Sequence, residues 1–275
     1  MRILAGLLTM ALLLAPRCAL ADLAAVEALV AKKAAIVEMM HGKARKALVT
    51  AAQDGRYQTY FSAATLEERD SLKTEIDRIS LEVQSHFHVE EMCLINPEGA
   101  EISRIVGNVI AYDLATNESE AIFFAPGFAL RPRTVYTSPI YMSPDANRWV
   151  VGYVTPVFGD YETQAILHYE HGLQVYQQAL NKDLEGDDRF IVAVDSDGWV
   201  ISDSRKAVAT EKRADSESPA DYFEHFTLGD MDLAQLVARL GGGAKGSSAL
   251  TTAAGRYDVA YQTDGHWTLI AIDRL

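Results

Sequence analysis

Two segments of the chain carry the same order of strand, tight turn and strand. The first is INPEGAEISR at residues 95–104, and the second is VDSDGWVISD at residues 194–203. In each, a polar turn with a glycine separates two short apolar runs, which is the pattern of a β-hairpin. Gly99 and Gly198 stand where a tight turn favours a positive φ. Any two hairpins share some of this pattern, but its recurrence favours two antiparallel sheets in one chain.

Helical periodicity precedes the first hairpin. Apolar residues recur at helical spacing from residue 23 to about 52 and from about 65 to 86. Thr65 and Glu68 have the spacing of a capping box at the start of the second helix. The chain is therefore expected to open with two helices, one of them long, before any strand.

After residue 90 the apolar residues alternate, which predicts strands. Further strands are expected in AIFFAPGF (121–128), TVYTSPIYMS (134–143), RWVVGYVTPVFG (148–159) and ETQAILHYEHG (162–172), with a helix over 169–180. A polar stretch at 181–188 marks a module boundary. Beyond it come a hairpin, a short helix over about 231–240, a flexible GGGAKGSS connection and closing strands with tight turns at Gly255 and Gly265.

The first 21 residues have the pattern of a secretory signal. Arg2 precedes an apolar run from residue 3 to 15, and Ala19 and Ala21 form an A-x-A site. The run is short for a membrane span, so we expect cleavage after Ala21 rather than an uncleaved anchor. The protein is then expected to be periplasmic or secreted.

Charge and cysteine content exclude some functions. The formal net charge of −13 argues against nucleic-acid and anionic-membrane binding, which require a cationic surface. After cleavage Cys93 is the remaining cysteine, so no internal disulfide is expected. Its apolar surroundings favour a buried small hydrophobe over a reactive thiol.

A long helix followed by two antiparallel modules in an exported chain resembles the double Cache family of extracytoplasmic sensor domains. The resemblance rests on the segments at 94–105, 135–170, 190–204 and 255–272. It implies an α+β fold in which a long N-terminal helix precedes two PAS-like Cache modules, each a mainly antiparallel sheet with flanking helices. The expected domains are a signal peptide (1–21), a helical region (22–86), a membrane-distal module (87–186) and a proximal-type module (187–275).

The resemblance also implies a function in sensing. Family members usually continue into a transmembrane helix and a cytoplasmic kinase, cyclase or chemotaxis module, whereas this chain ends at Leu275 after its last strand. We therefore expect a stand-alone periplasmic sensor or binding protein that signals through a membrane-bound kinase, cyclase or chemoreceptor. The alternatives are a ligand-free interaction protein that dimerises through its N-terminal helix, and a secreted enzyme.

In such sensors the sheet of the first module lines a small-molecule pocket. The candidate ligand-binding residues are Arg131, Arg133, Tyr136, Ser138, Tyr141, Trp149, Tyr153 and Thr155. An arginine grips a carboxylate with two parallel hydrogen bonds and tyrosine hydroxyls orient the rest, so a small organic carboxylate is the expected ligand. The alternative without a binding role is that the arginines are solvated loop charges and that the aromatic residues belong to the hydrophobic core.

The amino-acid-binding members of the family carry an arginine followed closely by Trp-Tyr, with an acidic residue further on. Here Arg131 and Arg133 are followed by Thr-Val-Tyr, which departs from that pattern, and Asp160 or Glu170 would have to supply the acid.

Metal and enzyme signals are weak. His86 with His88, and His168 with His171, are pairs that could converge on a divalent metal, but no further ligand stands close in sequence. No nucleophile elbow, phosphate loop, HExxH or dinucleotide fingerprint is present in the sequence. We therefore expect no metal, no cofactor and no catalytic activity.

Overall fold

The computed structural model describes residues 15–86, 90–159, 162–184, 188–213 and 216–275, with the side chains of 15–22 and His86 left out. The expected signal peptide lies almost wholly outside this part of the chain. None of the described helices combines the length and the apolar character that a membrane crossing requires.

Two compact units make up the chain, and neither is one contiguous segment. Val37–Gln178 and Ala209–Tyr222 form the first, called here the first module. The second module consists of the chain up to Ile36, Ala179–Val208 and Phe223–Leu275. The long helix α1 (Ala15–Ala51) contributes to both units, and the segment 209–222 joins the first sheet although it follows the second hairpin.

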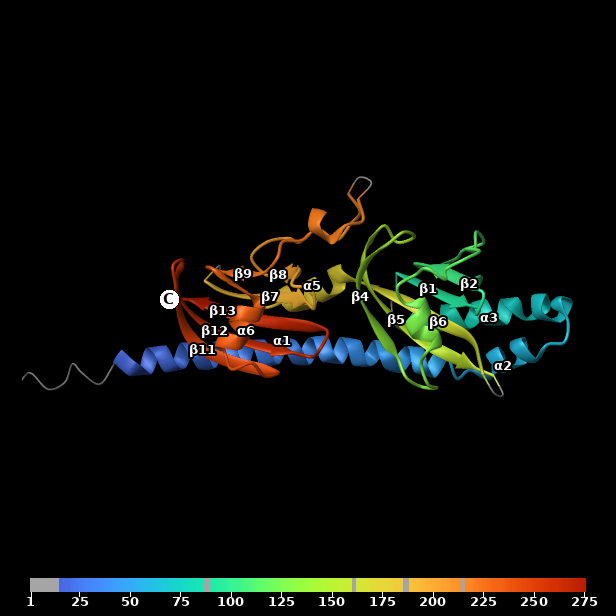
Figure 1. Cartoon of the computed structure of the whole chain (residues 1–275). Helices are drawn as coiled ribbons and strands as arrows, with labels where there is room; N and C mark the ends of the chain where they lie inside the picture. Colours follow the sequence, from blue (N-terminus) through green and yellow to red (C-terminus); the bar gives the residue numbers. More distant parts are fainter. Residues whose placement is uncertain (1–14, 87–89, 160–161, 185–187, 214–215) are drawn as a thin grey trace, which may run out of the picture. The chain divides into compact units, whose positions relative to one another are not determined.

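Three helices open the described part of the chain (Figure 1). Helix α1 is followed by the short α2 (Gly55–Ser62), which the sequence did not indicate, and by α3 (Leu66–His86). The expected capping box is present at α3: the Glu68 amide donates to Thr65 Oγ1 at 3.2 Å, and the Thr65 amide donates to the Glu68 carboxylate at 3.2 Å. These bonds satisfy amides that the helix itself leaves without partners.

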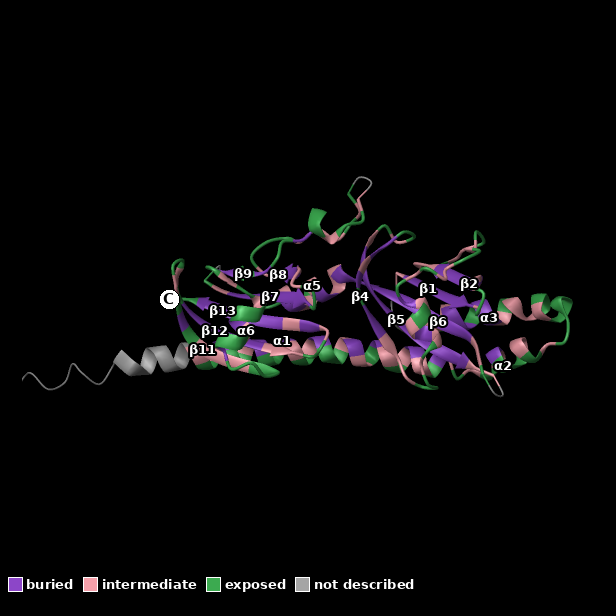
Figure 2. Cartoon of the chain, viewed as in Figure 1, coloured by how far each residue is buried: buried purple, intermediate pink, exposed green. Residues whose placement is uncertain are grey.

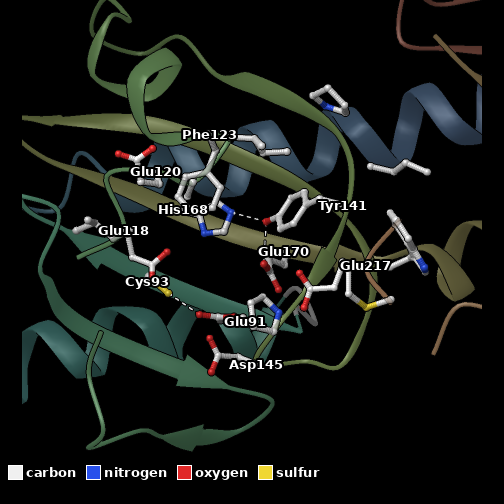
Figure 3. A pocket seen from close by; sticks show the side chains of 18 of the residues that line it. Glu91, Cys93, Glu118, Glu120, Phe123, Tyr141, Asp145, His168, Glu170 and Glu217 are labelled. Atoms are coloured by element: carbon white, nitrogen blue, oxygen red, sulfur yellow. Dashed lines mark hydrogen bonds between the residues drawn. The ribbon is translucent and has the colours of Figure 1, made fainter. Parts of the chain in front are cut away.

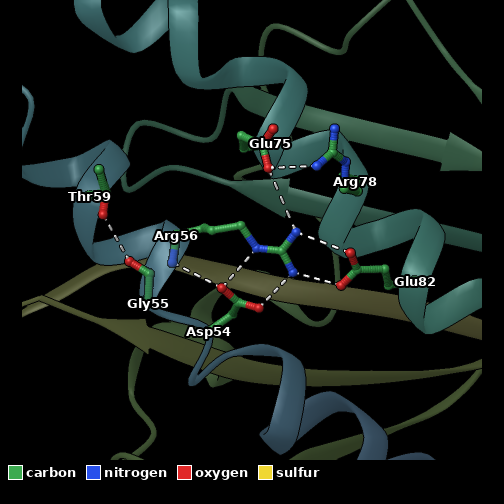
Figure 4. Close-up of polar contacts among 7 residues, drawn as sticks. All are labelled: Asp54, Gly55, Arg56, Thr59, Glu75, Arg78 and Glu82. Carbon is green, nitrogen blue, oxygen red and sulfur yellow. Dashed lines mark hydrogen bonds and ion pairs between the residues drawn. The ribbon is translucent and has the colours of Figure 1, made fainter.

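Helix α2 is held to α3 by one arginine (Figure 4). Asp54 caps α2 by accepting the Arg56 amide, and the Arg56 guanidinium pairs with Asp54 at 2.7 Å and with Glu82 on α3 at 2.6 Å. A planar guanidinium can serve two carboxylates at once, so a short helix with few buried residues is fixed in place.

A six-stranded antiparallel sheet forms the first module, in the order β3-β2-β1-β6-β5-β4. Its strands are β1 (Glu91–Ile95), β2 (Glu101–Val106), β3 (Val109–Ile110), β4 (Tyr136–Ser143), β5 (Arg148–Phe158) and β6 (Thr163–Gly172). One face meets the helices: Asp77 of α3 accepts a hydrogen bond from Ser103 of β2 at 2.6 Å, and His41 of α1 contacts Tyr153 of β5. Figure 2 shows that the long strands β5 and β6 are buried along most of their length.

The opposite face of this sheet carries the helix α4 (Phe124–Phe128). The sequence pattern predicted a strand here, and that prediction is wrong. Pro126 has no amide to donate to a ladder, and Gly127 packs directly on the sheet, where an added Cβ would lie 2.8 Å from Val154. The expected helix over 169–180 begins later, at Leu173, because β6 continues to Gly172; it is α5 (Leu173–Asn181).

The second module contains a five-stranded antiparallel sheet in the order β11-β12-β13-β7-β8. Its strands are β7 (Arg189–Asp195), β8 (Val200–Asp203), β11 (Lys245–Thr252), β12 (Gly255–Thr263) and β13 (Trp267–Arg274). A two-stranded ribbon, β9 (Thr227–Leu228) and β10 (Met231–Asp232), leads into helix α6 (Leu233–Arg239), and the 3₁₀ turn η1 (Pro219–Asp221) belongs to the first module.

The repeated hairpin is confirmed as the start of each sheet. Gly99 has a φ of 89° and Gly198 a φ of 90°, values that an L side chain disfavours. The α+β fold class with a long N-terminal helix is likewise confirmed. GGGAKGSS is a connection only in its first half, because β11 begins at Lys245.

Candidate ligand-binding cavity

The first module contains a cavity of about 580 Å³ on the sheet face that also carries α4 (Figure 3). Strands β1, β4 and β6 form its floor, and the segment 117–123 forms one wall. Its rim includes Pro144, Asp145 and, from a distant part of the sequence, Glu217 and Pro219.

Strand pairing places four polar side chains at the centre of this floor. In the antiparallel pair β1–β6, Glu91 is opposite Glu170 and Cys93 is opposite His168. Residues two apart on a strand share a face, so all four side chains point into the cavity. The Cys93 thiol donates to Glu91 Oε1 at 2.8 Å.

Tyr141 reaches across β5 to join two of these groups. Its hydroxyl lies 3.0 Å from His168 Nε2 and donates to Glu170 Oε1 at 2.7 Å. The path runs over Gly152, where an added Cβ would lie 2.9 Å from the Tyr141 hydroxyl and 3.0 Å from His168 Nε2. The absence of a side chain at Gly152 is therefore what allows the contact.

The tautomer of His168 follows from these contacts when Glu170 is ionised. The hydroxyl proton of Tyr141 then goes to the Glu170 carboxylate, so the tyrosine oxygen accepts from His168 and the imidazole proton is on Nε2. The ring stacks on Phe123 with centroids 3.6 Å apart, and burial lowers the pKa of His168 to about 3. The imidazole is thus neutral at physiological pH, with a bare acceptor at Nδ1.

Carboxyl groups dominate the polar lining. The acidic residues that line the cavity are Glu91, Glu101, Glu118, Glu120, Asp145, Glu170 and Glu217. Among the described lining residues there is no lysine or arginine. Arg104 is opposite Cys93 in the β1–β2 pair and so lies on the same face of the sheet, next to the lining, where Glu101, Asp113 and Asp145 pair with its guanidinium at 3.7, 2.8 and 3.0 Å.

Burial governs the ionisation of the deepest carboxyls. It raises the pKa of Glu91, which the neighbouring charge of Glu170 raises further. Burial also raises the pKa of Glu170, while the hydroxyls of Ser143 and Tyr141 act in the opposite direction. Both carboxyls therefore bind protons more readily than an exposed glutamate does.

Three of the eight candidate residues, Tyr136, Tyr141 and Trp149, line this cavity. Trp149 also makes an edge contact with Tyr222, with ring centroids 5.3 Å apart. Ser138 is buried in β4, where its hydroxyl accepts the Gly152 amide at 2.9 Å beside a register shift in the β4–β5 ladder.

The other four candidates lie away from the cavity. Arg131 is exposed and outside the lining. Arg133 and Thr155 border a smaller hollow of about 290 Å³ next to α2, and the Thr155 hydroxyl donates to the Thr134 carbonyl at 2.7 Å. No arginine is thus positioned to grip a carboxylate at the described lining.

Tyr153 belongs to a buried polar chain on the helix-facing side of the sheet. Its hydroxyl contacts His41 Nδ1 of α1 and lies 2.5 Å from the Tyr176 hydroxyl, which in turn lies 3.0 Å from His171 Nδ1. His168 and His171 therefore do not converge on a metal: three residues apart on a strand, they lie on opposite faces. The other pair, His86 and His88, lies outside the described side chains.

Three of these floor residues, Glu91, Cys93 and His168, were not expected from the sequence to bind the ligand, and Glu170 was expected only as one of two possible acidic partners of an amino acid. The signal that could have found them is alternation: Glu-Met-Cys in β1 and His-Tyr-Glu in β6 each place two polar groups on one face. Glu91, Cys93 and Glu101 also bring their ligand atoms within 4.8 Å of one another, a set that could hold a metal ion.

Solved sensor domains share this fold. The sensory domain of the Campylobacter jejuni chemoreceptor Tlp3 with isoleucine bound has a TM-score of 0.72 at 11% identity, over 94% of this chain and 95% of that one. The Tlp3 ligand-binding domain in complex with L-norvaline has a TM-score of 0.70 at 11% identity, over 92% of this chain and 91% of that one. The V. cholerae histidine kinase DctB sensor domain has a TM-score of 0.59 at 13% identity, over 93% of this chain and 98% of that one.

The structure comparison confirms the fold that the sequence indicated, since solved sensor domains align along nearly the whole chain. No family model matches the sequence, and no curated protein matches it significantly. The likeness is one of fold at low identity, so the ligand must be inferred from the residues of this cavity.

Proposed function

We propose that this protein is an extracytoplasmic sensor that captures a small organic molecule in the cavity of its first module. The observation that carries the proposal is the cavity itself: it measures about 580 Å³, lies on the sheet, and is lined by aromatic side chains and by polar groups that are mostly carboxyls. This size and composition suit a small-molecule site. The structural neighbours are sensory and ligand-binding domains, which supports the same role.

The proposed ligand contacts are six residues that line the cavity. Three were predicted from the sequence, Tyr136, Tyr141 and Trp149, and three come from the structure, Glu91, His168 and Glu170. We propose binding without turnover, followed by signalling through a separate membrane-bound kinase, cyclase or chemoreceptor. A dimer through helix α1 stays a prediction.

The location is part of the proposal. Export from the full-length gene should give a periplasmic protein whose amino terminus is Asp22, as expected for cleavage after Ala21. Mass spectrometry of the purified protein measures this directly. A mass that retains residues 1–21 would favour the anchored alternative.

A thermal-shift screen of the exported protein against amines, amino acids, organic acids and purines tests the capture of a ligand. A ligand at 100 times its Kd stabilises the native state by about 2.7 kcal/mol. The variant Ala121→Phe fills the cavity from its wall, and Ala129→Phe makes the same change at an exposed position outside it.

Ligand-induced shifts should disappear in Ala121→Phe and persist in Ala129→Phe. Shifts that survive filling would place the ligand elsewhere, and an absence of any shift would favour the ligand-free interaction protein.

A further inference from the structure

The deepest polar groups of the cavity leave two acceptors open. His168 is 1% exposed and Glu170 is 2% exposed. Within the described part of the chain, neither His168 Nδ1 nor Glu170 Oε2 has a partner in hydrogen-bond geometry, although the Ser143 hydroxyl lies close enough to Glu170 to lower its pKa. Leaving a buried polar atom without a partner is unfavourable, so the two open acceptors favour a ligand that donates hydrogen bonds.

Both open atoms are acceptors. When Glu170 is ionised it takes the Tyr141 hydroxyl proton, so His168 carries its own proton on Nε2 and Nδ1 presents a lone pair. An ionised Glu170 presents Oε2 as an acceptor as well. A ligand carboxylate or carbonyl would bring a third acceptor to the same place, whereas an N–H group satisfies both.

The charge around the cavity agrees with the hydrogen-bond pattern. Seven acidic residues line it, and the described lining offers no lysine or arginine to balance them. The nearby guanidinium of Arg104 is already shared by Glu101, Asp113 and Asp145. A bound cation would therefore relieve the repulsion between Glu91 and Glu170, which strand pairing holds opposite each other.

The walls provide a place for an apolar body attached to that charge. Phe123, Tyr136 and Trp149 line the cavity together with Ile95 and Ile140. Aromatic faces attract a cation within about 6 Å, and aliphatic side chains accept a short hydrocarbon. Figure 3 shows Phe123 and Tyr141 beside His168, with Glu170, Glu91 and Asp145 below them in the view.

We propose that the ligand is an organic amine, bound through a protonated N–H-bearing nitrogen that donates to His168 Nδ1 and Glu170 Oε2 while its apolar body lies against the aromatic wall. This rests on the proposed function and names its ligand class. A primary ammonium satisfies both acceptors, and a quaternary ammonium of the same charge satisfies neither.

The test uses the exported protein and calorimetric titration with matched probes. The cations are n-butylamine, 1,4-diaminobutane and n-butyltrimethylammonium, and the comparisons are butanoate, 1-butanol, L-isoleucine and zinc chloride. Glu170→Gln and Glu91→Gln remove the buried charges with little change in shape. Glu98→Gln removes the same charge from the exposed hairpin turn outside the cavity.

The expected result is binding of the primary amines, at least tenfold tighter than n-butyltrimethylammonium, with no binding of butanoate or butanol. Glu170→Gln should weaken amine binding at least tenfold and Glu98→Gln less than twofold. Equal binding of the quaternary probe, or amine binding unaffected by Glu170→Gln, overturns the proposal.

Other outcomes separate this inference from the proposed function. Binding of butanoate or isoleucine alone, abolished by Ala121→Phe, overturns the amine and leaves the sensor intact. Zinc binding that Cys93→Ser abolishes, without amine binding, assigns the floor to a metal and also overturns the amine. If no compound of the wider screen shifts the protein, the proposed function itself fails.

Discussion

Glu91 and Glu170 face each other across the antiparallel pair β1–β6, and both carboxyls are buried. Two like charges directly opposite on neighbouring strands repel, and burial removes the water that would screen them. The sheet is thus assembled at a cost that a proton or a bound cation can offset. The following predictions test this arrangement and the residues around it.

Stability without ligand should fall as the pH rises. The pKa values of Glu91 and Glu170 are raised above the ordinary 4.5, so the folded state binds more protons than the unfolded chain. Their stabilising contribution is complete below that value and is lost as the pH rises through the raised pKa values. Chemical denaturation between pH 5 and 8 should show a loss of about 1–3 kcal/mol.

The double variant Glu91→Gln/Glu170→Gln should flatten this dependence, and Glu98→Gln should keep it. The other titratable or charged groups near the pair are Glu90, Cys93, Glu101, Arg104, Glu118, Glu120, Tyr141, Asp145, His168 and Glu217. An unchanged pH slope in the double variant would show that these groups, rather than the pair, set it.

Gly152→Ala should disrupt the site from within the sheet. The new Cβ would lie 2.9 Å from the Tyr141 hydroxyl and 3.0 Å from His168 Nε2, so one of the rings must move. We expect a loss of about 1–3 kcal/mol in the free energy of unfolding, together with weaker ligand binding. Gly42→Ala is the matched control, because nothing lies within 4 Å of that helical position, and it should stabilise by about 0.5–1 kcal/mol.

Tyr153→Phe should affect stability and leave ligand binding unchanged. The hydroxyl joins His41 and Tyr176 on the sheet face away from the cavity, and its removal breaks both of these buried contacts. The expected cost is about 1–3 kcal/mol by denaturation. Tyr112→Phe, at an exposed position, should cost almost nothing. A tenfold loss of affinity in Tyr153→Phe would restore Tyr153 as a ligand contact.

Arg131→Ala and Arg133→Ala should each change ligand affinity less than twofold. Arg131 lies outside the lining, and Arg133 borders the smaller hollow beside α2. Tyr141→Phe, by contrast, removes the hydroxyl that orients His168 and should weaken binding severalfold or more. Calorimetry of the three variants with one ligand makes the comparison. A large loss in either arginine variant would support the carboxylate ligand that the sequence favoured.

Much of the fold could be predicted from short-range patterns in the sequence. The glycine turns at 99 and 198, the Thr65 capping box and the closing strands are short-range features, and each appears where its chemistry predicts. The exception at 121–128 is also local. Its aromatic residues favour a strand, whereas Pro126 and the close packing of Gly127 impose a short helix.

The cavity depends on register, which the sequence does not display. Alternation shows that Glu91 and Cys93 share a face, and so do His168 and Glu170, but not that β1 lies beside β6. That pairing joins segments far apart in the chain and brings Glu91 and Glu170 together on the floor of one cavity. Arg131 and Arg133 were expected at the ligand because they flank Pro132 just before the strand that carries Tyr136. Arg133 instead has a φ of 66° in a turn between α4 and β4.

Gly152 also predicts which positions of the site should covary in related chains. The Tyr141 side chain can cross β5 only because Gly152 has no side chain. The two residues therefore depend on each other, and neither should change alone in related chains. A lineage that replaced the glycine would have to shorten the tyrosine and would lose the bridge to His168 and Glu170. Covariation of these positions would therefore separate chains that keep this ligand specificity from those that share only the fold.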